Sequence, residues 1–185
     1  MCETLYINIL IGAFTILGVI IGSSLDFLKE RWKTKQEIKR SFLSPLSFRI
    51  HNLYIDIKTF KTYSPKEAVY LVKKIVTEIS MIQEILEPNV HVLPQHLYFD
   101  LNYCLKVVGY ISELFINTVE PLKKISKDEK EVFKITVQKF NVLENMISNF
   151  VAYTYLKAKG MKTKEYNKSL LTEEIIQKLV GKPQF

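Results

Sequence analysis

The chain has 185 residues, of which 48% are hydrophobic, so it is long enough to bury the core of one domain of ordinary size. Its two cysteines exclude a disulfide framework. Its net charge of +7 is concentrated, because residues 26–40 carry six bases and three acids, and residues 155–168 carry five bases and one acid. Residues 41–154 are nearly neutral and only three arginines occur in the chain, so we expect no nucleic-acid partner.

An uncharged apolar stretch of 21 residues runs from Leu5 to Leu25. As a helix it spans about 31 Å, which matches the hydrocarbon core of a bilayer. A helix also satisfies its own backbone groups, as lipid requires. A cleaved secretory signal is the alternative, but Met1–Thr4 lacks the bases that precede such a signal. The sequence therefore predicts a transmembrane anchor over residues 1–25.

The charges on either side of this stretch predict its orientation. No lysine or arginine precedes it, whereas six follow it within residues 26–40. The positive-inside rule then places the N-terminus outside and the C-terminal domain in the cytoplasm. We expect a single-pass protein of the cell membrane.

Gly18 and Gly22 form a small-xxx-small pair on one face of the expected anchor. Glycines at this spacing let two helix backbones approach closely in lipid, which favours association of the helices. The alternative is that glycine is simply common in membrane helices. We expect a homo-oligomer with Gly18 and Gly22 at the contact.

Residues 26–43 are expected to continue as a juxtamembrane helical stalk. Its bases suit the anionic lipids of the inner leaflet, and Trp32 suits the headgroup region. For the bases beyond Lys35, the solvated face of an ordinary helix is the alternative. The stalk residues expected to face lipid are Lys29, Arg31, Lys33 and Lys35.

Local signals mark the helices expected within residues 44–160. Ser44-Pro45 is typical of a helix start, and Ser64 with Glu67 has the pattern of a capping box. Glu87-Pro88-Asn89 is expected to stop the helix that Ser64 opens.

Two further helices are expected in the same region. One runs from about Gln95 to Val119. The other follows a second capping box at Ser126–Glu129 and reaches about Lys159, with Gly160 as its left-handed end.

Each of these four helices carries an apolar seam with steps of three and four residues. The seams are Leu46, Ile50, Leu53, Ile57 and Phe60; Ala68, Val72, Ile75, Ile79, Ile82 and Leu86; Leu97, Leu101, Cys104, Val108, Ile111 and Phe115; and Phe133, Thr136, Phe140, Leu143, Ile147, Phe150 and Thr154. Four seams with short connections predict an antiparallel four-helix bundle. The expected fold is all-α: a single N-terminal transmembrane helix continuing into a basic stalk, this bundle, and a short C-terminal amphipathic helix.

Residues 161–185 are expected to form a basic linker and an amphipathic segment that ends at Gly181. If the stalk leads away from the bilayer, alternation of helix direction brings the end of the last bundle helix back toward it. Four more bases are then expected to face lipid: Lys157, Lys159, Lys162 and Lys164. The segment's apolar residues either dock in a partner's groove or pack back on the bundle. They are Leu171, Ile175, Ile176 and Leu179.

His96, Asp100 and Cys104 are four residues apart and so share one side of a helix. Such a row is compatible with metal binding or a Cys–His pair. However, Cys104 lies in an apolar seam, where a thiol behaves as a small hydrophobe, and His96 lies in a solvated first turn. His51 at a bundle edge and His91 in a loop have no partner pattern either. We therefore expect no catalytic, metal or cofactor site and no enzyme.

These patterns predict a non-enzymatic, membrane-anchored helical interaction module, an adaptor or scaffold that associates with itself. Its expected partners are anionic lipids of the inner leaflet, a second copy and another protein. The alternative is a membrane-perturbing effector or sensor in which the bundle controls how the anchors assemble.

Overall fold

The computed structural model describes residues 2–119, 127–163 and 171–180, and for residues 2–14, 127–129 and 180 it describes the backbone alone. Helices make up almost all of this part, and no strand occurs in it, which confirms the all-α class. Contacts divide the chain into two units, Met1–Lys39 and Arg40–Phe185.

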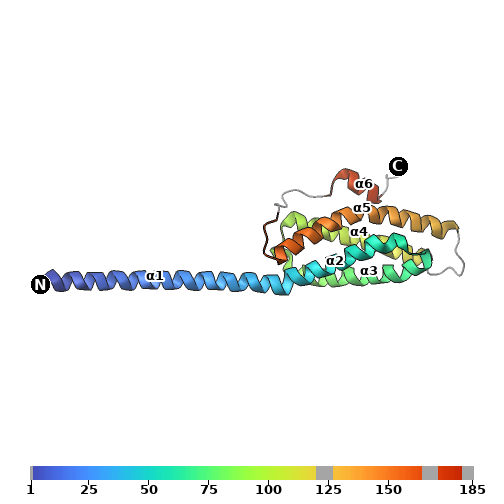
Figure 1. Ribbon diagram of the computed structural model, residues 1–185. Coiled ribbons are helices and arrows are strands. Elements are labelled where there is room, and N and C mark those ends of the chain that lie inside the picture. Colours follow the sequence, from blue (N-terminus) through green and yellow to red (C-terminus); the bar gives the residue numbers. More distant parts are fainter. Residues whose placement is uncertain (1, 120–126, 164–170, 181–185) are drawn as a thin grey trace. The chain divides into compact units, whose positions relative to one another are not determined.

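The first unit is one long helix, α1 (Cys2–Ile38), drawn in blue in Figure 1. No residue that breaks a helix occurs in it, as expected for the stalk. From Thr15 onward its side chains are exposed almost without exception. The first unit therefore buries no apolar seam of its own.

The predicted transmembrane helix is not supported by the structure. Among the described residues, no helix is both long enough and apolar enough to cross a membrane. From Asp26 onward α1 is rich in charged residues, and that part of the helix is too polar to lie in the hydrocarbon core of a bilayer. The side chains in the first half of the Leu5–Leu25 stretch lie outside the described residues.

A helix begins at Ser44 as predicted, but no break in the helical backbone precedes it. The chain passes from α1 through a π-helical turn, η1 (Lys39–Leu43), into α2 (Ser44–Thr59). Leu43 at the cap position has helical backbone angles and no side-chain capping hydrogen bond is formed. Pro45 lacks an N–H and crowds the carbonyl of Ser41, and the wider π turn around Ser41 accommodates both effects.

The capping box at the next helix is confirmed. The short 3₁₀ turn η2 (Phe60–Thr62) ends α2, and α3 (Pro65–Leu86) follows. The backbone N–H of Ser64 donates to Glu67 Oε2 at 3.0 Å, and the Ser64 hydroxyl donates to the same oxygen at 2.7 Å. These hydrogen bonds lower the pKa of Glu67. The pattern was readable from sequence because its partners are three residues apart.

The remaining helices match their expected bounds closely. After the 3₁₀ segment η3 (Glu87–Val92) come α4 (Gln95–Val119) and α5 (Lys127–Ala158), and α6 (Glu173–Val180) lies near the C-terminus. The second predicted capping box begins at Ser126, and the predicted stop of the C-terminal segment is Gly181. Both positions lie outside the described residues. All predicted seam residues are buried except Phe133, which is half-buried.

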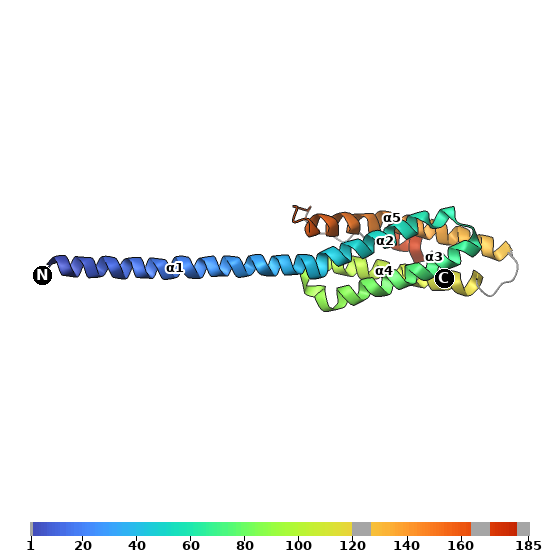
Figure 2. The same ribbon diagram turned by 60° about the horizontal axis from the view of Figure 1, so that its bottom comes forward.

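Helices α2 to α5 pack side by side as a bundle, which Figures 1 and 2 show from two directions. Their directions follow from contacts between aromatic rings. Phe60 at the end of α2 lies 5.4 Å from Phe115 late in α4 and 4.9 Å from Phe140 early in α5, between ring centroids. Helices α2 and α5 are therefore antiparallel, and the start of α2 lies at the same end of the bundle as the end of α5.

Gly160 ends α5 as predicted, with a φ of 74°. The N–H of Met161 donates to the carbonyl of Leu156, and that of Gly160 to the carbonyl of Lys157, both at 2.9 Å. This pair of hydrogen bonds is a Schellman motif. It fixes the direction in which the chain leaves the bundle.

Phe60→Ala should lower the free energy of unfolding by about 3–5 kcal/mol, because the ring is fully buried among Phe115, Phe133 and Phe140. Urea unfolding of the full chain in mild detergent, followed by far-UV circular dichroism, measures the change. Tyr70→Ala is the matched control, since Tyr70 is 80% exposed and should change the value by less than about 0.5 kcal/mol. Equal effects of the two substitutions would contradict this packing.

Candidate functional site

The most unusual surface of the chain is the apolar surface of α1. Nine large apolar side chains of this helix are between 52% and 63% exposed. They are Ile16, Leu17, Val19, Ile20, Ile21, Leu25, Phe27, Leu28 and Trp32. A Cβ added at Gly18 or Gly22 would meet no atom within 4 Å. Both glycines thus lie on an open face where a second helix backbone has room to approach.

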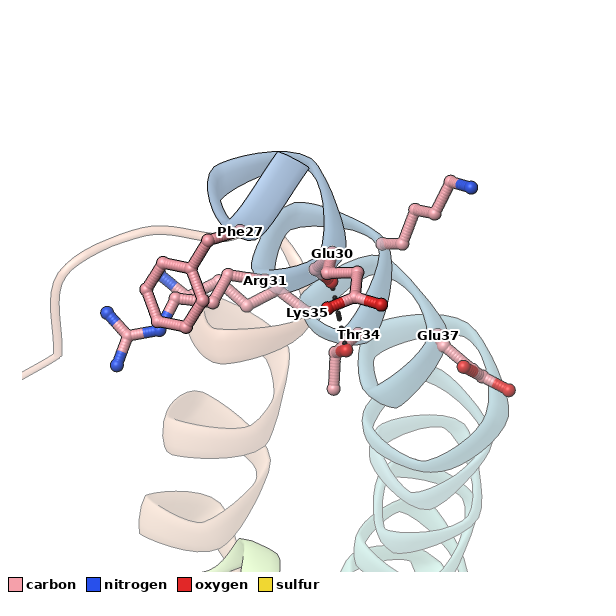
Figure 3. Close-up of a pocket in the computed structure, with 7 residues that line it drawn as sticks. Phe27, Glu30, Arg31, Thr34, Lys35 and Glu37 are labelled. Carbon is pink, nitrogen blue, oxygen red and sulfur yellow. Dashed lines mark hydrogen bonds between the residues drawn. The ribbon is translucent and has the colours of Figure 1, made fainter. Parts of the chain in front are cut away.

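The stalk part of α1 carries a shallow hollow of about 580 Å³, lined by Phe27, Glu30, Arg31, Lys33, Thr34, Lys35 and Glu37. In Figure 3, Arg31 runs beside the Phe27 ring, with its guanidinium 4.9 Å from the ring centroid. The Thr34 hydroxyl donates to the carbonyl of Glu30 at 3.0 Å. Charges of both signs share this surface and none of them is buried, so it has the character of a solvated helix face rather than a small-molecule site.

The row His96, Asp100 and Cys104 does not form a common site. His96 is exposed at the start of α4, whereas Asp100 and Cys104 are buried. The Cys104 thiol lies 3.9 Å from the Met146 sulfur on α5. His51 and His91 are exposed on other elements. Among the described residues, no group of three or more His, Cys, Asp or Glu side chains is placed to hold a metal ion.

Burial raises the pKa of Cys104 to about 12, with a smaller contribution from the nearby Asp100 charge. A thiol needs its thiolate form to act as a nucleophile or a metal ligand. At neutral pH Cys104 is therefore an inert part of the core.

Two ion pairs between α2 and α3 were not anticipated from the sequence. Lys74 Nζ lies 2.7 Å from Asp56 Oδ1, and Arg49 Nη1 lies 3.2 Å from Glu78 Oε1. Both carboxylates are buried, and among the described residues Asp56 Oδ2 has no hydrogen-bond partner. The only sequence signal is that Asp56 and Glu78 each precede a seam isoleucine.

The hydrogen bond from Lys74 to Asp56 raises the pKa of Lys74. A raised pKa in the folded chain means that the pair stabilises the fold from neutral pH up to the ordinary lysine pKa. This stabilisation is lost as the pH rises through the pKa of the folded chain. The pair therefore fixes α2 against α3 throughout the physiological range.

The C-terminal helix α6 packs on α5. Leu179 is 2% exposed and Ile175 is half-buried, whereas Ile176 remains 37% exposed. Leu171 precedes the helix and is half-buried. Of the two interpretations of this segment, packing back on the bundle explains the burial of Leu179.

A groove of about 360 Å³ remains between α5 and α6. Its lining residues are Asn141, Val142, Asn145, Met146, Asn149, Ile175 and Lys178. Asn149 donates to the carbonyl of Asn145 at 2.9 Å, and Lys178 pairs with Glu174 at 2.6 Å. Asn149 and Lys178 thus use their side chains within their own helices, and Asn141 and Asn145 are exposed to solvent.

The bases at the end of α5 are exposed, as a lipid-facing or solvated role requires. Lys157 and Lys159 lie over the rings of Tyr153 and Tyr155 at 5.7 and 5.6 Å, and Lys162 follows Gly160. Lys164 lies outside the described residues.

In the folded chain at pH 8, Cys104 should react with iodoacetamide orders of magnitude more slowly than an exposed thiol, because it is buried and protonated. The comparison is made in a Cys2→Ser background, by mass spectrometry, with and without urea. Rapid labelling of the folded chain would contradict the structural role of Cys104.

No protein family, no curated protein and no solved structure matches this chain. Its function must therefore be inferred from its own residues and contacts.

Proposed function

We propose that the chain is a membrane-tethered helical interaction module, not an enzyme, which associates with itself through α1 and presents its bundle in the cytoplasm. The observation that carries the proposal is the exposed apolar surface of α1 around Gly18 and Gly22. A contiguous apolar surface of this kind is unfavourable in water and indicates an interaction site. Lipid on most sides and a second α1 at the glycine face would cover it.

Several sequence features support the membrane as the environment of α1. The described apolar side chains continue an uncharged stretch that begins at Leu5. The bases Lys29, Arg31, Lys33 and Lys35, together with Trp32, follow the stretch directly. Aromatic and basic residues at this position suit the headgroups of an anionic inner leaflet.

The bundle supplies surfaces on which a protein partner can dock. On α4, Phe99, Tyr110 and Leu114 are exposed, and their spacing of 11 and 4 residues places them along one face of the helix. Aromatic side chains in such positions are typical of interaction sites. This surface supports an adaptor or scaffold role.

A membrane-perturbing effector or sensor is the second candidate. The helical backbone runs without a break from α1 through η1 into α2. The bundle is therefore joined directly to the proposed anchor, which favours this candidate. Measuring the membrane potential after induction of the full-length chain separates the candidates, because an adaptor leaves the potential intact.

Membrane insertion predicts that the chain stays with the membrane fraction after extraction with alkaline carbonate. The double substitution Leu17→Lys and Ile21→Lys should release most of it, because both positions lie inside the apolar stretch and a charge costs up to about 2.5–3.5 kcal/mol near the centre of a membrane helix. Immunoblots of pellet and supernatant measure the distribution. The matched control places the same charges in the stalk, Phe27→Lys and Leu28→Lys, and should leave the chain in the pellet. Release of the unaltered chain would exclude the proposed anchor.

Association through the glycine face predicts that Gly18→Ile and Gly22→Ile weaken self-association several-fold, because an isoleucine side chain holds the two backbones apart. A two-hybrid reporter for membrane helices measures the effect. Ile20→Leu, on the face of α1 opposite the two glycines, is the control and should leave the signal unchanged. Equal signals from all variants would argue against this contact.

A further inference from the structure

The end of α5 carries an exposed surface with a definite geometry, formed by Tyr155, Lys157, Lys159, Met161 and Lys162, which we call the α5 end patch. The Schellman hydrogen bonds at Gly160 turn the chain, and a hydrogen bond between the side chains of Tyr153 and Thr163 ties the residues after the turn to the last turns of the helix. These hydrogen bonds fix the position of the patch at the end of α5.

The patch is basic without local compensation. Lys157, Lys159 and Lys162 are all exposed, and residues 145–163 contain no acid. Arg40 lies at the same end of the bundle, because the start of α2 and the end of α5 are adjacent. Two exposed acids near this end of the bundle, Glu84 late in α3 and Glu87 in η3, belong to other elements. A negatively charged partner is therefore favoured.

Two apolar side chains accompany these bases. Tyr155 is 52% exposed and Met161 is 56% exposed. In a Schellman motif the residue at the position of Met161 commonly packs against the preceding helix turn, so its exposure is unusual. Lysines at a helix end also interact favourably with the helix dipole, but this effect does not account for the exposed Tyr155 and Met161.

We propose that the α5 end patch binds the surface of an anionic phospholipid bilayer, an inference that rests on the proposed membrane tether. Tyr155 and Met161 enter the interfacial layer, and Lys157, Lys159 and Lys162 interact with lipid phosphates. Aromatic and apolar side chains beside lysines are the combination that binds such surfaces.

The length of the stalk limits how the α5 end patch can reach the bilayer. Leu25 and Ile38 are 13 residues apart in one helix, which is about 20 Å. Surface charges act over only about 8–10 Å at physiological salt, so a stalk standing upright on the membrane would leave the patch out of reach. Binding of the patch to the bilayer therefore requires a stalk that runs at a low angle to the membrane, an orientation in which its exposed Phe27, Leu28 and Trp32 can enter the interfacial layer.

The test uses the full chain in nanodiscs, with Cys2→Ser and Cys104→Ala and a spin label on Met161→Cys. With phosphatidylglycerol present, collisions of the label with a water-soluble nickel complex should fall several-fold relative to phosphatidylcholine alone. Replacing Lys157, Lys159 and Lys162 by glutamine should restore the collisions. A label on Tyr70→Cys, an exposed position on α3, should report equal collisions in both lipids.

The outcomes separate this inference from the proposed function. A chain that does not co-purify with the nanodisc contradicts the membrane tether itself. A chain that co-purifies but whose label at position 161 is equally accessible in both lipids overturns the α5 end patch alone. Shielding that survives the glutamine substitutions also overturns it, because the recognition is then not electrostatic.

Discussion

Removal of apolar side chains from water is the constraint on which the structure depends, and the two units meet it differently. In the second unit, α2, α3, α4 and α5 each turn one seam inward, so that Leu46, Val72, Leu97 and Leu143 are all fully buried. The described part of α1 has no such neighbour, and its apolar side chains remain more than half exposed. A surface of this kind requires an environment outside the chain, which is why the proposed function begins with α1.

Polar groups inside the bundle are accommodated in different ways, and the fully buried Ser112 Oγ has no hydrogen-bond partner among the described residues. Thr136 and Thr154 occupy seam positions, and each hydroxyl donates to the carbonyl four residues earlier in α5, at 2.8 and 2.7 Å. Asp56 and Glu78 are instead paired across α2 and α3. Each pair joins a buried carboxylate to a partly exposed cation, so removal of the cation leaves a buried charge without its partner, and the pairs favour a single register of the two helices.

The π-helical turn joins the two units without interrupting the helical backbone. Phe42 within this turn is almost completely buried, so the second unit begins its core before the expected helix start at Ser44. A π turn contains a wider loop than an α turn and so changes which face of the following helix points inward.

The sequence alone determined the features that arise within a few residues of chain. The capping box at Ser64, the left-handed end at Gly160 and the seams of the four bundle helices were predictable because their partners are local or follow the period of a helix. The tertiary structure decided what depends on neighbours distant in sequence: the pairing of Asp56 with Lys74, the placement of Cys104 against Met146, and the burial of Leu179 while Ile176 stays exposed. No local pattern distinguishes these side chains, because which of them is buried is set by the helix that packs against it.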